Sequence, residues 1–372
     1  MALLTVEDLR VSFNTPDGVV QAVRGLSFAV DRGQTLAIVG ESGSGKSVAT
    51  QTITRLTPGA KVSGRAVFDG QDLLQASHDT LRHIRGDKIG MVFQDPLSSL
   101  HPYYRIGWQI VEMIHAHDRS MSRRAARARA AELLGLVGIP RPAERLDDYP
   151  HQFSGGMRQR VMIAMAMALN PELLIADEPT TALDVTVQAQ VLQVMRNLQE
   201  EFGTAIILIT HDLGVVADMA DEVVVMYAGA AMEQAPRRDM FYHHHHPYTG
   251  GLLASLPTRG GQARLTPIPG SPPSLIQLPP GCPFAPRCAY AWDKCRTETP
   301  PLDPVFGDSA HRSACWLPHE DEQSRREGGE QHAAANAERN AVLFSTVDAT
   351  ELVDRESFGL PSTEDEQGKG IA

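Results

Sequence analysis

One short segment constrains the fold of this chain more than any other part of the sequence. The apolar run Thr35–Val39 is followed by eight residues with the pattern G-x-x-x-x-G-K-S. Between a strand and a helix this pattern forms a P-loop, a cradle of backbone N–H groups for phosphate, and it predicts an α/β fold. The loop consists of Gly40, Glu41, Ser42, Gly43, Ser44, Gly45, Lys46 and Ser47.

Each residue type in this loop suits the binding of a nucleotide. Glycines allow the N–H groups to point inward, and the following helix presents its positive end to the same anion. We expect Lys46 to reach the β- and γ-phosphates of ATP and the Ser47 hydroxyl to bind Mg²⁺. A chance Gly/Ser turn before a helix is the alternative, and the complete motif after a strand argues against it.

A second apolar run, Leu173–Ala176, is followed by Asp177 and Glu178. Carboxylates at the C-terminal end of a parallel strand point into the ligand crevice of an α/β sheet. We expect Asp177 to hold Mg²⁺ and Glu178 to orient and polarise the attacking water. Alone, such a pair is commonly a surface feature of a strand end, but the upstream P-loop favours the functional interpretation.

The segment "HQFSGGMRQR" places a serine and two glycines at the expected start of a helix. Such a helix start is a second anion-binding site. One chain does not need two γ-phosphate cradles for one nucleotide, so we expect this cradle to face nucleotide held by a different subunit. Its residues are Ser154, Gly155, Gly156 and Gln159.

In their order along the chain, the motifs resemble those of the ATP-binding cassette (ABC) ATPases. That family has a P-loop, a glutamine loop, an "LSGGQ" signature, a Walker B strand, a D-loop and a switch histidine. The corresponding residues here are Gly40–Ser47, Gln94 in "MVFQDP", Ser154-Gly155-Gly156, Asp177-Glu178, Asp184 after "AL" and His211 in "LITHDL". The signature departs from the family at Phe153, where leucine is usual, and in "GGMRQ" for "GGQ".

The resemblance implies a RecA-like P-loop NTPase core, an antiparallel β-subdomain and a helical subdomain at about residues 97–153. It also implies roles for single residues. Gln94 would help to bind Mg²⁺ and link it and the γ-phosphate to the helical subdomain, and His211 would contact the γ-phosphate and the attacking water. Asp184 would belong to the D-loop, and Phe13 would stack on adenine; a core aromatic is the alternative for Phe13.

Two further segments, "DPLSSLHPYYRIGWQI" and "HPYTGGLLASLP", resemble the ATPases of oligopeptide and dipeptide importers, although His101 stands where asparagine is usual. This resemblance implies an ATPase that lies at the cytoplasmic face of the cell membrane and powers the uptake of peptides. Its partners would be a second ABC ATPase, with a heterodimer preferred to a homodimer, two transmembrane permease subunits and an extracytoplasmic peptide-binding protein. Import of nickel or another small solute, and a regulatory or DNA-maintenance ATPase, are the alternatives.

Composition divides the chain into three parts and excludes other classes of protein. We expect an ABC nucleotide-binding domain at 1–245, a Pro/Cys-rich C-terminal domain at 246–318 and an acidic, disordered tail at 319–372.

The longest apolar runs, such as Val161–Leu169, are shorter than the ~20 residues of a membrane span. The net charge of −11 gives no sign of a surface that binds nucleic acid. The run His243–His246 suggests a surface turn.

All four cysteines fall in the C-terminal part: Cys282, Cys288, Cys295 and Cys315. Their spacing lacks the close pairs of ordinary zinc sites and of ferredoxins, so it indicates one four-thiol site without naming the metal. Four independent buried thiols are the alternative. The segment "CPFAPRC" resembles the C-terminal segment of peptide-importer ATPases, which in some members binds a 4Fe–4S cluster. The resemblance therefore implies an iron–sulfur cluster first and Zn²⁺ second.

Overall fold

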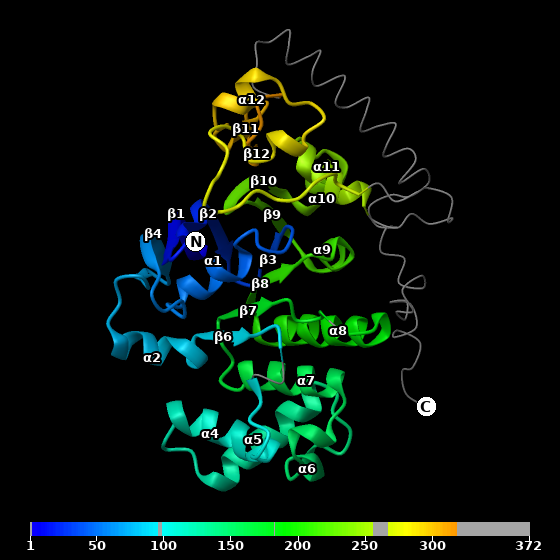
Figure 1. Cartoon of the computed structure of the whole chain (residues 1–372). Helices are drawn as coiled ribbons and strands as arrows, with labels where there is room; N and C mark the ends of the chain where they lie inside the picture. The colour runs from blue at the N-terminus through cyan, green and yellow to red at the C-terminus, as the bar shows by residue number, and fades with distance from the viewer. Residues whose placement is uncertain (1, 96–98, 182, 256–266, 318–372) are drawn as a thin grey trace. The chain divides into compact units, whose positions relative to one another are not determined.

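The computed structural model describes residues 2–95, 99–181, 183–255 and 267–317 (Figure 1). Contacts divide the chain into two compact units. Unit 1 contains the described residues of Met1–Ser77 and Ile207–Thr346, and unit 2 contains those of His78–Ile206. The expected acidic tail, 319–372, lies outside the described residues. The three-part division of the sequence stays a prediction.

An antiparallel sheet forms the N-terminal part of unit 1, as the resemblance implied. Its strands are β1 (Ala2–Thr15), β2 (Gly18–Asp31), β4 (Lys61–Phe68) and β5 (Gln71–Asp72), in the spatial order β2-β1-β4-β5. Strands β1 and β2 form a hairpin in which Phe13 pairs with Val20 and Thr15 with Gly18. At the end of β4, Ala66 and Phe68 are buried and Val67 between them is half-buried, which is typical of a sheet with one solvated face.

A second sheet of unit 1 carries the P-loop. Its strands are β3 (Thr35–Val39), β8 (Ala205–Thr210, which begins at the border of the unit), β9 (Glu222–Tyr227), β10 (Ala230–Pro236), β11 (Asp303–Val305) and β12 (Asp308–Ser313). Within this unit their order is β11-β12-β10-β9-β3-β8. Strand β3 runs parallel to β9, whereas β9, β10, β12 and β11 pair antiparallel. Every residue of β3 and β8 is buried, as expected for the inner strands of an α/β sheet.

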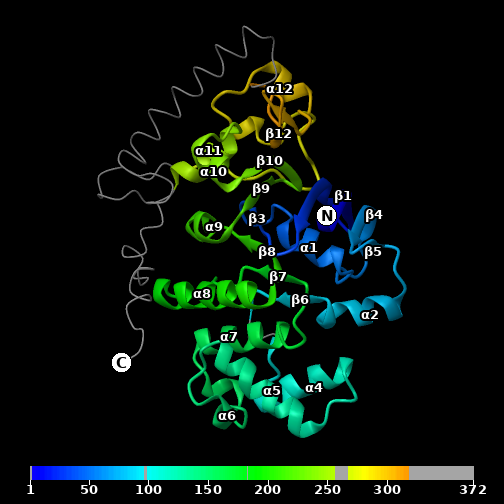
Figure 2. The ribbon, with the colours of Figure 1, turned by 180° about the vertical axis from the view of Figure 1, so that it is seen from behind.

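Short helices accompany this sheet. They are α1 (Lys46–Ile53), α9 (Leu213–Met219), α10 (Arg237–Tyr242), α11 (Pro247–Ala254), α12 (Asp293–Thr297) and the 3₁₀ turn η2 (Ala285–Arg287). In both views α12 and β12 lie beside α11 and β10 (Figures 1 and 2). Short elements joined by loops are what a proline-rich segment favours, because proline opposes long helices and central strands.

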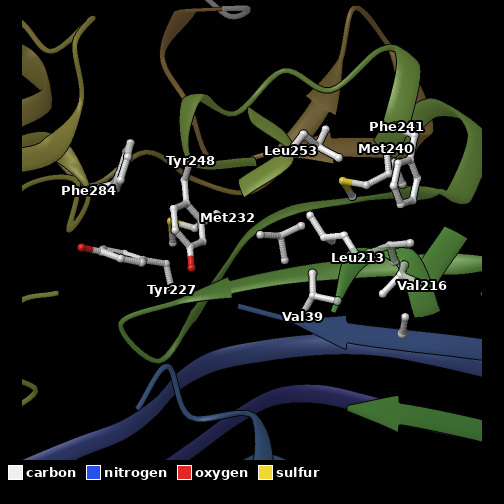
Figure 3. Packing of buried hydrophobic residues seen from close by; sticks show 14 of the residues in the cluster. Val39, Leu213, Val216, Tyr227, Met232, Met240, Phe241, Tyr248, Leu253 and Phe284 are labelled. Atoms are coloured by element: carbon white, nitrogen blue, oxygen red, sulfur yellow. The ribbon is translucent and has the colours of Figure 1, made fainter. Parts of the chain in front are cut away.

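An aromatic core joins the C-terminal segment, residues 267–317, to the strands of unit 1 (Figure 3). The ring of Tyr248 lies 4.7 Å from that of Tyr227 and 5.2 Å from that of Phe284, measured between centroids. All three side chains are buried, and Phe284 belongs to "CPFAPRC". Burial of aromatic area on this scale holds the C-terminal segment firmly against β9 and α11.

Unit 2 is mainly helical. Its elements are α2 (His78–Asp87), β6 (Ile89–Val92), α4 (Ile106–His117), α5 (Arg123–Leu136), α6 (Pro142–Arg145), η1 (Pro150–Gln152), α7 (Gly155–Ala166), β7 (Leu173–Asp177) and α8 (Val185–Phe202). Strands β6 and β7 are parallel. Ser122 caps α5 by accepting a hydrogen bond from the backbone N–H of Ala125 at 3.2 Å. No helix in the described parts of either unit combines the length and apolar composition needed to cross a membrane.

The prediction of a surface turn for the four-histidine run is wrong. His244 and His246 are buried. The backbone N–H groups of His245 and His246 donate to the carboxylate of Glu233, at 2.6 and 3.1 Å. This carboxylate is fully buried and also binds Nε2 of His311 at 2.8 Å. A buried acid on β10 therefore draws the polar run inward, which the sequence pattern could not indicate.

Candidate functional site

Two glycines shape the P-loop where it follows β3. Gly40 has a φ of 150° and Gly45 a φ of 98°. A Cβ on Gly40 would lie 2.1 Å from the carbonyl oxygen of Met226, and a Cβ on Gly45 would lie 2.2 Å from that of Ala22. Both positions therefore exclude a larger side chain, and the loop lies close against neighbouring backbone.

Lys46 folds back over the loop. Its buried ammonium donates to the carbonyl oxygens of Gly40 at 2.7 Å and Glu41 at 2.9 Å. Lys46 also begins α1, so the first N–H groups of this helix open toward the loop. The Ser44 hydroxyl is buried without a hydrogen-bond partner among the described residues, and the Ser47 side chain is half-buried. These donors suit a phosphate group, as the motif predicted.

The loop is also held by residues that the sequence motifs did not single out. The backbone N–H of Glu41 donates to the hydroxyl of Tyr248 at 2.9 Å. Both oxygens of the Glu41 carboxylate accept hydrogen bonds from Arg287, at 2.7 and 2.9 Å. No contiguous motif contains these pairs, because Glu41 and Arg287 are 246 positions apart.

His211 shares a cavity with the start of the P-loop. The cavity, of about 360 Å³, is lined by the loop residues Gly40 and Glu41, by His211 and by apolar side chains that include Leu213, Leu252 and Ile268. His211 is exposed at the end of β8, and the carboxylate of the next residue, Asp212, caps α9 by accepting the N–H of Gly214 at 2.8 Å. Unit 1 thus brings together the P-loop and the predicted switch histidine.

Unit 2 brings together the glutamine and the carboxylates. Asp177 ends β7 and is buried. The carboxylate of Glu178 accepts hydrogen bonds from the Gln94 side-chain amide at 3.0 Å and from the Thr181 hydroxyl at 2.9 Å. Gln94 and Glu178 are 84 positions apart, and both were predicted from motifs. Thr181 was not predicted, although its place three residues after Glu178 could have suggested it.

The signature residues start α7, as expected. The Ser154 hydroxyl accepts the N–H of Met157 at 3.3 Å and so caps the helix. Ser154 and Gly155 are exposed, and a Cβ on Gly155 would meet no atom within 4 Å. Gly156 faces the other way, where a Cβ would lie 2.2 Å from Val187 Cγ1. The side of α7 that bears Gly155 is therefore open, and the side of Gly156 packs on α8.

Three other predicted residues have different surroundings. Gln159 is 2 % exposed, and this burial argues against its direct contact with a nucleotide on another subunit. Asp184 is exposed and caps α8 by accepting the N–H of Val187 at 3.0 Å. Phe13 is half-buried on β1, so its ring is neither a fully buried core residue nor fully free.

Comparisons with known proteins agree with this geometry. A family model described as "ABC transporter" matches residues 23–181. The oligopeptide transport ATP-binding protein OppD of Bacillus subtilis is 53% identical over 324 residues, which is 86% of this chain and 90% of that protein. The chain belongs to the ABC transporter family. A second family model, "Oligopeptide/dipeptide transporter, C-terminal region", matches residues 232–295.

Further ABC proteins extend the comparison. The dipeptide transport ATP-binding protein DppD of Bacillus subtilis is 52% identical, over 85% of this chain and 94% of that protein. A dimeric ATP-binding cassette in a post-hydrolysis state, bound to ADP and Pi, is 29% identical with a TM-score of 0.58, over 63% of this chain and 99% of that chain. The cassette cbiO1 from Clostridium perfringens is 30% identical with a TM-score of 0.56, over 65% of this chain and 91% of that chain. The predicted cassette fold is confirmed, and the chain is an ABC-type ATPase with MgATP as its substrate.

The four cysteines of this ABC ATPase line one small, largely apolar cavity, together with Trp292 and Trp316 among others. The backbone N–H of Cys282 donates to the carbonyl of Cys295 at 2.8 Å. Burial raises the pKa of the Cys282 and Cys315 thiols and that of Cys288 to about 11. Yet no group of three or more His, Cys, Asp or Glu side chains in the described ranges is arranged to hold a metal ion. The four thiols thus share a cavity, and thiolates are chemically suitable ligands for a metal. In the described residues, however, the thiols are not arranged as a ligand set.

Proposed function

We propose that this chain is the ATP-hydrolysing subunit of an importer of dipeptides or oligopeptides, bound at the cytoplasmic face of the cell membrane. The observation that carries the proposal is the match of residues 232–295 to the C-terminal region of oligopeptide and dipeptide transporters. Relatives named as oligopeptide and dipeptide transport ATP-binding proteins, which align with 85–86% of the chain, support it further. These names do not favour the nickel or DNA-maintenance alternatives.

Within the nucleotide site we propose the roles that the motifs implied. The P-loop N–H groups and Lys46 bind the phosphates, while Ser47 and Asp177 bind the magnesium of MgATP with help from Gln94. Glu178 polarises the attacking water, and His211 contacts the γ-phosphate. The hydrogen bond between Gln94 and Glu178 supports a common site for these two residues. Phe13 is proposed to stack on the adenine.

We propose that the N-terminal end of α7 contacts ATP held by a second ABC ATPase. The exposure of Ser154 and Gly155 and the open space around Gly155 support this, since a cradle for another subunit's phosphate must be accessible. Asp184 of the D-loop would lie at the same interface. A solved ABC cassette with 29% identity is dimeric, which supports a dimer. Of the two kinds of dimer, we propose a heterodimer in preference to a homodimer.

The transport proposal requires two transmembrane permease subunits and an extracytoplasmic peptide-binding protein. Its test is to reconstitute the full chain with the membrane subunits and second ATPase with which it co-purifies, in liposomes that contain the binding protein. We expect di- or oligopeptides to stimulate ATP hydrolysis. We also expect labelled peptide to accumulate on the side of the membrane opposite the binding protein. Stimulation by nickel but not by peptide, or by DNA without any membrane subunit, would contradict the proposal.

We also propose that Cys282, Cys288, Cys295 and Cys315 hold a 4Fe–4S cluster, with Zn²⁺ as the alternative. Their common cavity supports one site, and four thiolates are the usual ligands of such a cluster. When bound, the metal group would stabilise the thiolates that burial disfavours and fasten a segment with little core of its own. The test is anaerobic purification of the full chain. Iron, sulfide and an absorption band near ~400 nm support the cluster, and stoichiometric zinc without iron refutes it.

A further inference from the structure

Arg287 joins the C-terminal segment to the P-loop through a paired fork of hydrogen bonds. Its Nη1 lies 2.7 Å from Glu41 Oε2 and its Nη2 lies 2.9 Å from Glu41 Oε1. The arginine side chain is 6 % exposed and the glutamate side chain 25 %. Two parallel, charge-assisted bonds fix orientation as well as distance, and water screens a pair this buried only weakly.

The arginine itself is held on its other sides. Its Nε donates to the carbonyl of Pro269 at 2.8 Å, and Nη1 also lies 3.2 Å from the Tyr227 hydroxyl. The guanidinium carbon lies 5.7 Å from the ring centroid of Tyr227 and 5.9 Å from that of Phe284. The hydrogen bonds to Glu41 raise the pKa of Arg287, so it stays charged. Arg287 is therefore a fixed positive group and not a mobile surface side chain.

Glu41 transmits this anchoring to the phosphate-binding groups. Its N–H donates to the Tyr248 hydroxyl, and its carbonyl accepts from the Lys46 ammonium at 2.9 Å and from the N–H of Ser44 at 3.2 Å. A shift of Glu41 would therefore move an acceptor of Lys46 and the backbone that turns toward phosphate. In addition, a carboxylate on this loop without its cation would repel the triphosphate.

We propose that Arg287 is a positioning residue for MgATP binding: it holds the P-loop through Glu41 and neutralises the negative charge of that carboxylate. The inference rests on the phosphate-binding role proposed for the loop. It assigns to the C-terminal segment a part in nucleotide binding, which is distinct from its proposed function in holding a metal cluster. The competing explanation is that the pair only fastens the segment to the fold.

The test is calorimetric titration of the full chain with MgATP. We expect Arg287→Met to raise Kd about tenfold, because it loosens the loop and leaves Glu41 as an unpaired charge beside the phosphates. Adding Glu41→Gln to this variant should recover most of the loss, since it removes that charge. The loss should also shrink in high salt, and in steady-state hydrolysis it should appear in KM for ATP more than in kcat.

Two further variants separate a positioning role of Arg287 from simple attachment of the segment to the fold. Arg312→Met removes another arginine of the C-terminal segment, which donates to the carbonyl of Leu302 at 2.9 Å; it should leave Kd unchanged. Arg287→Lys retains the charge without the fork and should give an intermediate Kd, even if the methionine variant folds poorly. An unchanged Kd in Arg287→Met, an equal loss in Arg312→Met, or no recovery on adding Glu41→Gln would each overturn the proposal. If Lys46→Ala also left Kd unchanged, the phosphate-binding role of the loop would fail as well.

Discussion

Glu178 has a backbone conformation that residues other than glycine rarely adopt. Its φ of 48° lies in the left-handed region, which costs about 1–2 kcal/mol for a side chain with a Cβ. The hydrogen bonds from Gln94 and Thr181 hold the carboxylate in place despite this cost. Such strain is typical of groups whose position matters for chemistry. The left-handed backbone conformation also turns the chain away from the direction of β7 directly after Asp177.

Replacing this carboxylate separates binding from hydrolysis. We expect Glu178→Gln to bind MgATP with normal affinity and to lower kcat at least about 100-fold, because an amide cannot act as the general base. Glu200→Gln, an exposed change on α8, is the control and should hydrolyse ATP normally. ATPase activity of the Glu178 variant close to that of the unchanged protein would remove Glu178 from the proposed role.

Lys46 offers the complementary change. We expect Lys46→Ala to raise Kd for MgATP at least about thirtyfold, because the loop loses its buried positive charge. Calorimetry measures this directly, and Lys61→Ala, an exposed change at the start of β4, should bind as the unchanged protein does. Equal affinities of the two variants would show that Lys46 does not contact phosphate.

At the residue scale, contiguity decided what the sequence could predict. The loop residues from Gly40 to Ser47 and the pair Asp177-Glu178 each lie in one short motif, and the structure places them at strand ends as expected. Arg287 could not be found in this way, because its partner Glu41 is far away in the sequence. Arg287 lies in the motif "CPFAPRC", but that motif gives no indication of a contact with the P-loop.

At the element scale, burial decided the outcome. The apolar runs of β3 and β7 predicted inner strands, and both are fully buried. Strand β12 has the sequence "DSAHRS", with no alternation of apolar residues, and it pairs with β10 at only two positions. Neither propensity nor pattern could therefore predict that the C-terminal segment adds strands to the sheet.

The close packing of α7 on α8 gives a prediction for an element. Gly156→Ala would place a Cβ against the branched side chain of Val187, and we expect it to lower the free energy of unfolding by about 1–3 kcal/mol. Gly155→Ala, where space is open, should keep or slightly raise stability because alanine favours helix. Urea unfolding compares the two variants, and equal destabilisation would contradict the packing described.

At the scale of the molecule, the buried Glu233 predicts acid sensitivity. Burial alone would raise its pKa, but the hydrogen bond with His311 and the charges of His244 and His311 outweigh it and lower the pKa to about 2, from an ordinary value of 4.5. Because the folded-state pKa is the lower one, the stabilisation is present above pH 4.5 and is lost as the pH falls toward 2.

Glu233→Gln should therefore reduce the free energy of unfolding at pH 7 by about 2–4 kcal/mol, and the difference from the unchanged protein should shrink as the pH falls below 4.5. Urea unfolding at several pH values measures both. Glu298→Gln, which changes an exposed carboxylate of the C-terminal segment, should have little effect. A difference that stays constant down to pH 3 would contradict the assigned pKa shift.

Described residues on both sides of the composition change near residue 246 belong to unit 1. Physical reasons lie in the aromatic core around Phe284 and in the hydrogen bond between His311 and Glu233. Composition shows which part of the sequence is rich in proline and cysteine, but it does not predict which side chains that part packs against. For this reason the sequence could predict the motifs of the segment and not its attachment.

The pairing of β12 with β10 also bears on how the protein avoids aggregation. Strand β11, the outermost of this sheet in unit 1, has three residues, and the middle one is Pro304. A short strand with a proline is a poor template for another chain, whereas β10 would offer a longer row of unpaired backbone groups. We expect a chain that ends at Thr299, without both strands, to self-associate in size-exclusion chromatography, while the full chain does not do so through this edge.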